Sequence, residues 1–256
     1  MKILALGDVV GIRAVDYLAE KLASVKKQLG VDLTVANGEN ATEIKGLSNY
    51  DAHALLDSGI DMLTGGNHIF GKRDLAPFLD SSPSIIRPAN YPGRVPGVGH
   101  SIIDVRSRRV LCINVSGCVY MEPLASPFET VDAILEREKG RYDVALMDIH
   151  AEATSEKYAL ARYFDGRIAV MFGTHTHVPT ADEQILPRGS AYITDLGMCG
   201  PVGGILGTDA DAVIDRFLTH TPTAFFVSNT PIRAHGALFE LDDADLRPIS
   251  VRRIKF

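Results

Sequence analysis

The sequence has few cysteines, and none of them are spaced as a disulfide framework or a metal-binding motif would be. Its 256 residues contain three, Cys112, Cys118 and Cys199, with no C-x-x-C pair among them. An odd and scattered set of cysteines is typical of free thiols in a reducing compartment. The sequence therefore predicts a cytoplasmic protein with three free thiols.

Long apolar runs and an excess of basic residues are also missing. No apolar stretch approaches the roughly 18 residues of a membrane-spanning helix, and the first, Ile3 to Leu6, is too short for a signal peptide. The 26 basic and 32 acidic residues give a net charge of −6, and the densest basic segments are short. Neither membrane insertion nor an extended nucleic-acid surface is therefore expected.

The chain carries no internal repeat and no linker rich in proline, glycine or serine. Its apolar and charged fractions, 46% and 23%, are those of an ordinary globular protein. Strand-like and helix-like patterns alternate at first, and the last third is predicted to consist mostly of β-hairpins. We therefore expect one α/β domain over residues 1–256, built from stacked α and β layers.

Apolar periodicity and turn residues predict the individual elements. Strands are expected over residues 2–7, 32–36, 61–64, 101–105, 109–115, 143–149, 167–172, 183–186, 191–194, 237–241 and 248–254. Helices are expected over residues 13–29, 48–59, 71–79, 127–139, 154–164 and 209–218. Gly30 suits the end of the first helix, and Ser48 with Asp51 resembles a capping box that opens the second.

Side chains that can bind metals or transfer protons follow five of the predicted strands. They are Asp8, Glu39 with Asn40, Asn67 with His68, His150, and His175 with His177. Because ligands bind outside the carboxyl ends of the strands in open α/β sheets, we expect these residues to converge at one sheet edge. Carboxylate, amide and imidazole ligands without a thiolate suit iron, manganese or zinc. The pattern therefore predicts a metal centre at this edge.

Each of these residues also has an ordinary structural interpretation. Asp8 could cap a helix, Asn40 could be a turn residue, and His150 could be a hydrogen-bonded, half-buried histidine. On an extended strand the rings of His175 and His177 would share a face roughly 6.6–7 Å apart, which suits two neighbouring ions better than one. The coincidence of all five groups at one edge is what favours the metal centre.

Other polar residues nearby are expected to have structural roles. Glu152 and Glu156 should cap and charge the first turn of the helix at residues 154–164. Lys45 and Lys72 follow two of the site loops and could attract an anionic substrate, but a solvated charge is the simpler interpretation.

The site residues resemble, in order, the signature blocks of the calcineurin-like metallophosphoesterases. The blocks are Gly7-Asp8, Gly38-Glu39-Asn40, Gly66-Asn67-His68, His150 and Gly173-Thr174-His175-Thr176-His177. Longer stretches, at residues 7–11, 35–41, 150–157 and 173–182, resemble the YmdB-like phosphodiesterase branch of that superfamily almost verbatim. With residues 192–198, the resemblance covers essentially the whole chain.

Three positions depart from the pattern of the wider superfamily. Val10 stands where a histidine ligand is usual, and Glu39 stands where a bridging aspartate is usual. Ile69 replaces an acidic residue. The first two changes are normal in the YmdB-like branch, so they favour that branch.

The resemblance implies a four-layer α/β/β/α sandwich with a dinuclear metal site at one sheet edge. The first ion would be held by Asp8, Glu39, Asn40 and His177. The second would be held by Glu39, Asn67, His150 and His175. Iron would be the first choice for both ions, with manganese and zinc as alternatives. A hydroxide bridging two ions about 3.5–4 Å apart would be the nucleophile. His68 would protonate the leaving oxygen, or would otherwise orient Asp8 or the phosphate by a hydrogen bond.

The activity that the resemblance implies is metal-dependent hydrolysis of small phosphodiesters, 2′,3′-cyclic nucleotides in particular. Two alternatives stay open: a phosphomonoesterase or nucleotidase that uses the same site, and a regulatory protein that senses a nucleotide with little turnover. An amidohydrolase barrel is disfavoured, because its His-x-His pair follows the first strand and this one follows four other site loops. The oligomeric state stays open, and a homo-oligomer is compatible with the sequence.

Overall fold

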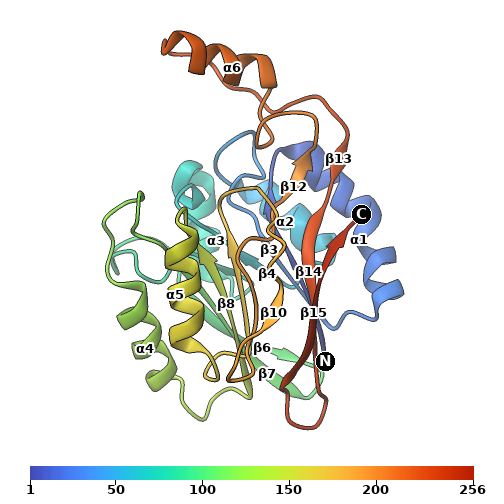
Figure 1. The fold of residues 1–256 in the computed structure, drawn as a ribbon, viewed down its shortest axis with the longest axis vertical. Coiled ribbons are helices and arrows are strands. Elements are labelled where there is room, and N and C mark those ends of the chain that lie inside the picture. Colours follow the sequence, from blue (N-terminus) through green and yellow to red (C-terminus); the bar gives the residue numbers. More distant parts are fainter.

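The computed structural model describes residues 1–256 and contains two six-stranded sheets and one three-stranded sheet (Figure 1). The first sheet consists, in spatial order, of β15 (Pro248–Lys255), β14 (His235–Leu241), β1 (Lys2–Leu6), β3 (Leu33–Asn37), β4 (Met62–Thr64) and β5 (Ile85–Ile86). The second consists of β10 (Gln184–Ile185), β11 (Ala191–Ile193), β9 (Val170–Thr174), β8 (Val144–His150), β7 (Arg108–Ser116) and β6 (His100–Val105). The small sheet joins β13 (Ile232–Arg233), β12 (Met198–Pro201) and β2 (Asp8–Val9).

All helices except α6 flank these sheets, and α6 stands away from them (Figure 1). The helices are α1 (Ile12–Leu29), α2 (Asn49–Asp57), α3 (Ala76–Ser81), α4 (Pro127–Arg137), α5 (Thr154–Phe164) and α6 (Ala210–Thr219), with 3₁₀ turns η1 (Ile69–Gly71) and η2 (Arg73–Leu75). None of them is both long enough and apolar enough to cross a bilayer. Gly30 ends α1 in the left-handed conformation, and the Ser48 hydroxyl caps α2 by accepting from the Asp51 backbone N–H.

The central strands are buried on both faces, as parallel strands covered on both sides are. In β1, Ile3 and Ala5 belong to an apolar cluster that contains residues of both large sheets, while Leu4 and Leu6 belong to a second cluster with α1 and α2. A third cluster joins the second sheet to α4 and α5. Burying one such Leu or Ile side chain stabilises the fold by about 1.5–3 kcal/mol. The first cluster therefore holds the two sheets together, and the other two hold the helices onto the sheets.

Most predicted elements are confirmed within a few residues, and the α5 boundaries match the prediction. The expected helix at residues 71–79 is wrong in part, because two 3₁₀ turns precede a short α3. The strand expected at 167–172 begins later, at Val170, since the chain is still closing the turn after α5. The pairs β2–β12 and β12–β13 were not predicted, because their strands are only two to four residues long.

The expectation that one sheet edge carries the site is wrong. The strands β1, β3 and β4 belong to the first sheet, whereas β8 and β9 belong to the second. Their carboxyl ends nevertheless meet, since Asn37 at the end of β3 donates to Asp148 in β8 at 3.3 Å. The site therefore lies where two sheets converge, which brings side chains together from both sides.

Candidate metal centre

The structure brings all eight predicted site residues into one connected polar cluster. Each has a polar atom within 3.7 Å of a polar atom of another member. The members are Asp8, Glu39, Asn40, Asn67, His68, His150, His175 and His177.

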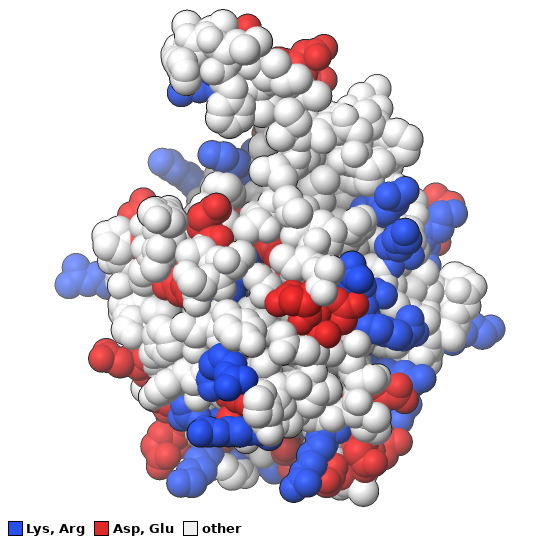
Figure 2. All heavy atoms as spheres, viewed as in Figure 1, with Lys and Arg blue, Asp and Glu red and all other residues white.

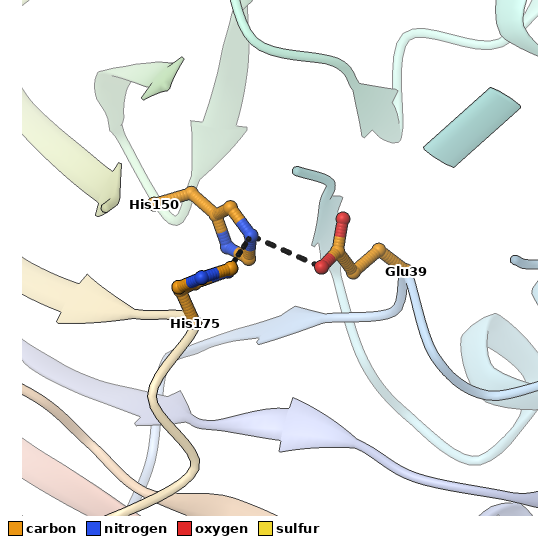
Figure 3. Close-up of side chains that lie close together, drawn as sticks. All are labelled: Glu39, His150 and His175. Carbon is orange, nitrogen blue, oxygen red and sulfur yellow. Dashed lines mark hydrogen bonds and ion pairs between the residues drawn. The ribbon is translucent and has the colours of Figure 1, made fainter. Parts of the chain in front are cut away.

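One half of the cluster is centred on His150 Nε2. This nitrogen lies 3.0 Å from Glu39 Oε1, 3.0 Å from Asn67 Oδ1 and 3.0 Å from His175 Nδ1. Figure 3 shows the two imidazoles and the carboxylate turned toward a common point, and their ligand atoms all lie within 4.8 Å of one another. Three potential ligands, Glu39, His150 and His175, therefore already share one small volume.

The other nitrogen of His150 determines what faces that volume. Thr174 Oγ1 donates to Asp148 Oδ1 at 2.7 Å, so its hydrogen is already used. His150 Nδ1 lies 2.9 Å from the same Thr174 oxygen and must therefore donate to it. In the neutral ring this leaves a lone pair on Nε2, directed at two oxygens and another nitrogen. Such a concentration of electron pairs requires a cation, either a proton or a metal ion.

The electrostatics of the Glu39–His150 pair agree with this requirement. Burial acts to lower the pKa of His150, but Glu39, Asp8 and Asp148 raise it to about 9. Burial likewise acts to raise the pKa of Glu39, but His150 and His68 hold it well below its usual value. Both side chains are fully buried, and the attraction between them outweighs the cost of burial, so the site favours positive charge beside Glu39.

The second half of the cluster contains Asp8, Asn40 and His177. His177 Nε2 lies 3.7 Å from Asp8 Oδ1 and 3.4 Å from Asn40 Nδ2. Asp8 Oδ1 is buried and has no hydrogen-bond partner, and burial raises the pKa of this carboxyl. A buried carboxylate oxygen without a partner is costly, so a cation beside it would remove a penalty of this site.

The imidazoles of His150, His175 and His177 are each oriented by a partner on the outer side. Glu152 Oε2 lies 3.1 Å from His175 Nε2, and the Leu206 carbonyl oxygen lies 3.0 Å from His177 Nδ1. Metal-binding histidines generally have such a partner, which fixes the ring and its tautomer. Glu152 was expected to cap α5, and the structure places it on His175 instead.

Glu156 lies in the first turn of α5, as expected, but the expectation that it caps the helix is wrong. Its carboxylate accepts from the backbone N–H groups of Cys118 and Val119 at 2.9–3.2 Å, so it orders the loop after β7. The N-cap of α5 is Ala153, which has no side-chain capping bond.

The backbone of the site is shaped for close approach. A β-carbon at Gly66 would collide with His150 Nε2 and Glu39 Oε2, so only glycine fits beside the cluster. His175 and His177 have φ angles of 96° and 63°. This left-handed backbone conformation is unfavourable for residues other than glycine. Backbone strain of this kind occurs mainly at functional sites, where the surroundings hold it in place.

His68 lies at the edge of the cluster and is partly exposed. Its Nδ1 is 3.0 Å from Asn40 Oδ1, and its backbone N–H donates to Glu39 Oε2 at 2.7 Å. Its Nε2 has no protein partner, so this nitrogen is free to meet a bound molecule.

Sequence reasoning missed two positioning groups. Asp148 is one of them, and burial raises its pKa to about 6. Its carboxylate accepts hydrogen bonds from Thr64, Thr174 and Asn37 behind His150. Lys157 and Asp195 form a buried ion pair behind the loop that carries His175 and His177. A signal for Asp148 was present, because a carboxyl in the otherwise apolar strand β8, two residues before His150, must have buried partners.

Comparison with known proteins places the chain in a family. The family described as "YmdB-like protein" matches residues 4–254. A 2′,3′-cyclic-nucleotide 2′-phosphodiesterase of Bacillus subtilis (strain 168) is 41% identical over 254 residues, which cover 99% of this chain and 96% of the relative.

Two solved structures share the fold along the whole chain. A hypothetical protein from Thermus thermophilus has a TM-score of 0.95 at 37% identity, covering 100% of this chain and 99% of that one. A protein of Mycoplasma pneumoniae described as a novel phosphatase has a TM-score of 0.94 at 34% identity, covering 100% of this chain and 93% of that one. These matches confirm the resemblance found in the signature blocks, and the chain belongs to the YmdB-like protein family.

Proposed function

We propose that this protein is a metal-dependent phosphodiesterase that hydrolyses small phosphodiesters, with 2′,3′-cyclic nucleotides as its substrates. The observation that carries the proposal is the lone pair of His150 Nε2, which faces Glu39, Asn67 and His175 while Thr174 holds the other nitrogen. The Bacillus subtilis relative, whose name states this activity, supports the substrate class.

The proposed centre holds two ions that share Glu39. The first would be bound by Asp8, Glu39, Asn40 and His177, and the second by Glu39, Asn67, His150 and His175. The partnerless Asp8 oxygen and the crowding at His150 Nε2 support one cation in each half. Ligation by Asn40 Oδ1 requires the amide to rotate by half a turn, because this oxygen now faces His68 and the amide nitrogen faces His177.

The donor set also bears on the identity of the ions. It consists of carboxylates, amide oxygens and imidazoles without a thiolate, which suits iron, with manganese and zinc as alternatives. When bound, a metal pair supplies Lewis acidity toward the phosphoryl oxygens and activates water for in-line attack.

The protein's own groups complete the reaction. Hydrolysis adds the oxygen of water to phosphorus and breaks the bond to the ribose 2′ oxygen, which must then gain a proton. His68 is the proposed donor, because its Nε2 is free to meet the leaving oxygen. Once the Asn40 amide has rotated, its nitrogen donates to His68 Nδ1, which places the ring proton on Nε2. The proton passes from His68 Nε2 to the leaving oxygen, and the product keeps its phosphate on the 3′ oxygen.

Two structural proposals accompany this function. The order of helices, first sheet, second sheet and helices is proposed to be the four-layer α/β/β/α sandwich of the metallophosphoesterases. The apolar cluster between the sheets and the two clusters beneath the helices support it. Residues 1–256 are proposed to act as one domain, since strands from both ends of the chain pair in the first sheet.

A substrate panel tests the function. Purified full-length protein would be analysed for metal content and then assayed with bis-p-nitrophenyl phosphate, p-nitrophenyl phosphate and 2′,3′-cyclic nucleotides. The proposal predicts metal-dependent turnover of the diesters and the cyclic nucleotides, with a 3′-monophosphate product. Faster turnover of the monoester would indicate a phosphomonoesterase. Tight nucleotide binding with negligible turnover would indicate a regulatory protein.

A further inference from the structure

Two aromatic side chains, Phe70 and Tyr91, pack against each other beside the loop that carries His68. Their ring centroids are 5.2 Å apart and the rings are inclined by 68°, which makes an edge-to-face pair. Phe70 lies in the 3₁₀ turn η1, which begins at His68 and is closed by the Gly71 N–H, a donor to the His68 carbonyl at 2.8 Å. One turn of chain therefore joins this pair to the proposed proton donor.

Tyr91 is also held in place by its neighbour Asn90. The buried Asn90 amide donates to the Ser116 carbonyl at 2.8 Å and accepts from the Ser116 N–H at 2.9 Å. Ser116 in turn is paired with His150 across β7 and β8. These bonds fix Tyr91 beside the carboxyl ends of the strands that form the metal centre.

The ring of Tyr91 is only partly covered by the protein. Tyr91 and Phe70 are both half-buried, whereas Ile69 between His68 and Phe70 is fully buried in the core. Burial raises the pKa of the Tyr91 hydroxyl, and the carboxylates of Glu39 and Glu122 raise it further, without a hydrogen bond from any group of the chain. Tyr91 therefore offers uncovered ring surface within electrostatic range of Glu39, the proposed bridging ligand.

The proposed reaction determines where the nucleoside of the substrate lies. In a 2′,3′-cyclic nucleotide the leaving 2′ oxygen belongs to the ribose, and the base is attached to the neighbouring carbon of the sugar ring. A His68 that protonates the 2′ oxygen has the ribose beside it, so the base lies beyond His68 and away from the metal ligands. Phe70 and Tyr91 are the aromatic pair that adjoins His68.

Charge offers little to recognise the nucleoside. Acidic and basic side chains are interspersed over the face of the molecule shown in Figure 2. Lys72, which follows the turn η1, is already paired with Glu43 at 3.2 Å. A nucleobase is uncharged at neutral pH and has two flat faces, and stacking on an aromatic ring binds every base.

We propose that Tyr91 forms the wall on which the base of the nucleotide stacks, and that Phe70 holds the Tyr91 ring by its edge-to-face contact. This inference rests on the proposed function, and it makes the base a part of what the site recognises. Because stacking uses the faces of the base and not its edges, the subsite accepts a nucleoside 2′,3′-cyclic phosphate with any of the four bases.

A pair of substrates that differ only in the base tests this. The methyl riboside 2′,3′-cyclic phosphate keeps the cyclic ester and carries a methoxy group in place of the base. For the wild-type chain, kcat/KM should be about ten-fold or more higher for 2′,3′-cyclic AMP than for the methyl riboside, as stacking of one base implies. Tyr91→Ala should reduce this ratio to about one, and Tyr91→Phe, which keeps the ring, should restore it.

The matched control is Tyr163→Ala. Tyr163 also forms an edge-to-face pair, with Phe128 at 5.4 Å, but on the outer side of α4 and α5. This variant should keep the wild-type ratio. Circular dichroism and thermal unfolding would establish that all variants fold.

A binding measurement separates the base subsite from the proposed reaction. The sequence contains no tryptophan, so Tyr91→Trp introduces a single fluorescent reporter into the proposed wall. Adenosine 3′-monophosphate, the product, should quench this fluorescence saturably, whereas the 3-phosphate of the methyl riboside should not. Tyr163→Trp is the control and should be quenched by neither.

The outcomes distinguish the two proposals. Saturable quenching of Tyr91→Trp without turnover of either cyclic phosphate would refute the proposed function and support the base subsite. Turnover of both substrates with an unchanged ratio in Tyr91→Ala would overturn the base subsite and leave the function standing. Absence of quenching in Tyr91→Trp by adenosine 3′-monophosphate would likewise overturn the base subsite.

Discussion

Lys157 Nζ lies 2.7 Å from Asp195 Oδ2, and both side chains are almost completely excluded from solvent. The same Asp195 oxygen accepts from the backbone N–H of Thr176 at 3.2 Å and from its hydroxyl at 2.8 Å. Thr176 stands between His175 and His177, whose backbones are both left-handed. The buried ion pair thus ties α5 to the loop that presents two proposed metal ligands and holds its strained conformation.

Breaking this pair should be costly. Lys157→Met leaves the Asp195 carboxylate buried without its cation, and such losses typically destabilise a fold by about 3–5 kcal/mol. The control is Arg253→Met, which removes the partly exposed pair with Glu183 on the surface, for which about 0–1 kcal/mol is expected. Urea denaturation measures both. A Lys157→Met chain no less stable than the control would contradict the role given to the pair.

Glu39→Gln should affect both metal positions at once. The carboxylate lies between the two halves of the cluster, 3.0 Å from His150 Nε2 and, through Oε1, 3.4 Å from Asn40 Nδ2. Elemental analysis should find metal content far below the wild-type value, while circular dichroism shows an unchanged fold. Asp51→Asn alters a buried carboxyl that accepts from Ser48 and Thr42 and contacts none of the eight cluster residues, so this control should keep its metal. Full metal content in Glu39→Gln would refute the bridging assignment.

His68→Asn distinguishes proton donation from orientation. If His68 protonates the leaving oxygen, kcat should fall about 10²–10⁴-fold while metal content and fold are kept. The loss should be smaller for bis-p-nitrophenyl phosphate, whose leaving group hardly needs a proton, than for a cyclic nucleotide, whose ribose oxygen does.

Other results for His68→Asn have separate meanings. Equal losses on both substrates, with metals retained, would mean that His68 only orients its neighbours. Loss of metal would mean that it is a ligand.

Glu138 links acid stability to a surface cluster far from the site. Its side chain is buried, and although burial acts to raise its pKa, His100, Arg141 and Arg137 lower it. A carboxyl whose pKa is lower when folded stabilises the protein above its unfolded pKa, and this stabilisation is lost as the pH falls through the folded value. Glu138→Gln should therefore be less stable than wild type at pH 7, and the difference should shrink as the pH falls below the usual pKa of a glutamate, about 4.3. A constant difference across that range would rule out this linkage.

The convergence of the site residues could be predicted from the sequence. How the strands that carry them are divided between sheets could not. Asp8, Glu39, Asn67 and His175 each follow a recognisable strand and His150 ends one, and strand ends are where such side chains gather. Strand pairing depends on contacts between segments that are distant in the sequence, and local periodicity does not indicate these contacts. The second sheet was therefore implied only by the family resemblance and not by the local sequence pattern.

The outer partners of the histidines were hidden for a similar reason. Glu152 lies just before α5, where a carboxylate at the start of a helix has an ordinary explanation. Only the folded chain, which brings the start of α5 beside the loop after β9, places it 3.1 Å from His175. Leu206 holds His177 through its backbone carbonyl, a role that any residue could fill and that sequence therefore cannot indicate.

The most direct test of the proposed dinuclear centre is a metal titration followed by turnover of a 2′,3′-cyclic nucleotide. Protein stripped with a chelator would be titrated with Mn²⁺ or, without oxygen, with Fe²⁺. We expect negligible turnover in the stripped protein and a rise in turnover that saturates at two ions per chain. Full turnover without metal, or saturation at a single ion, would contradict it.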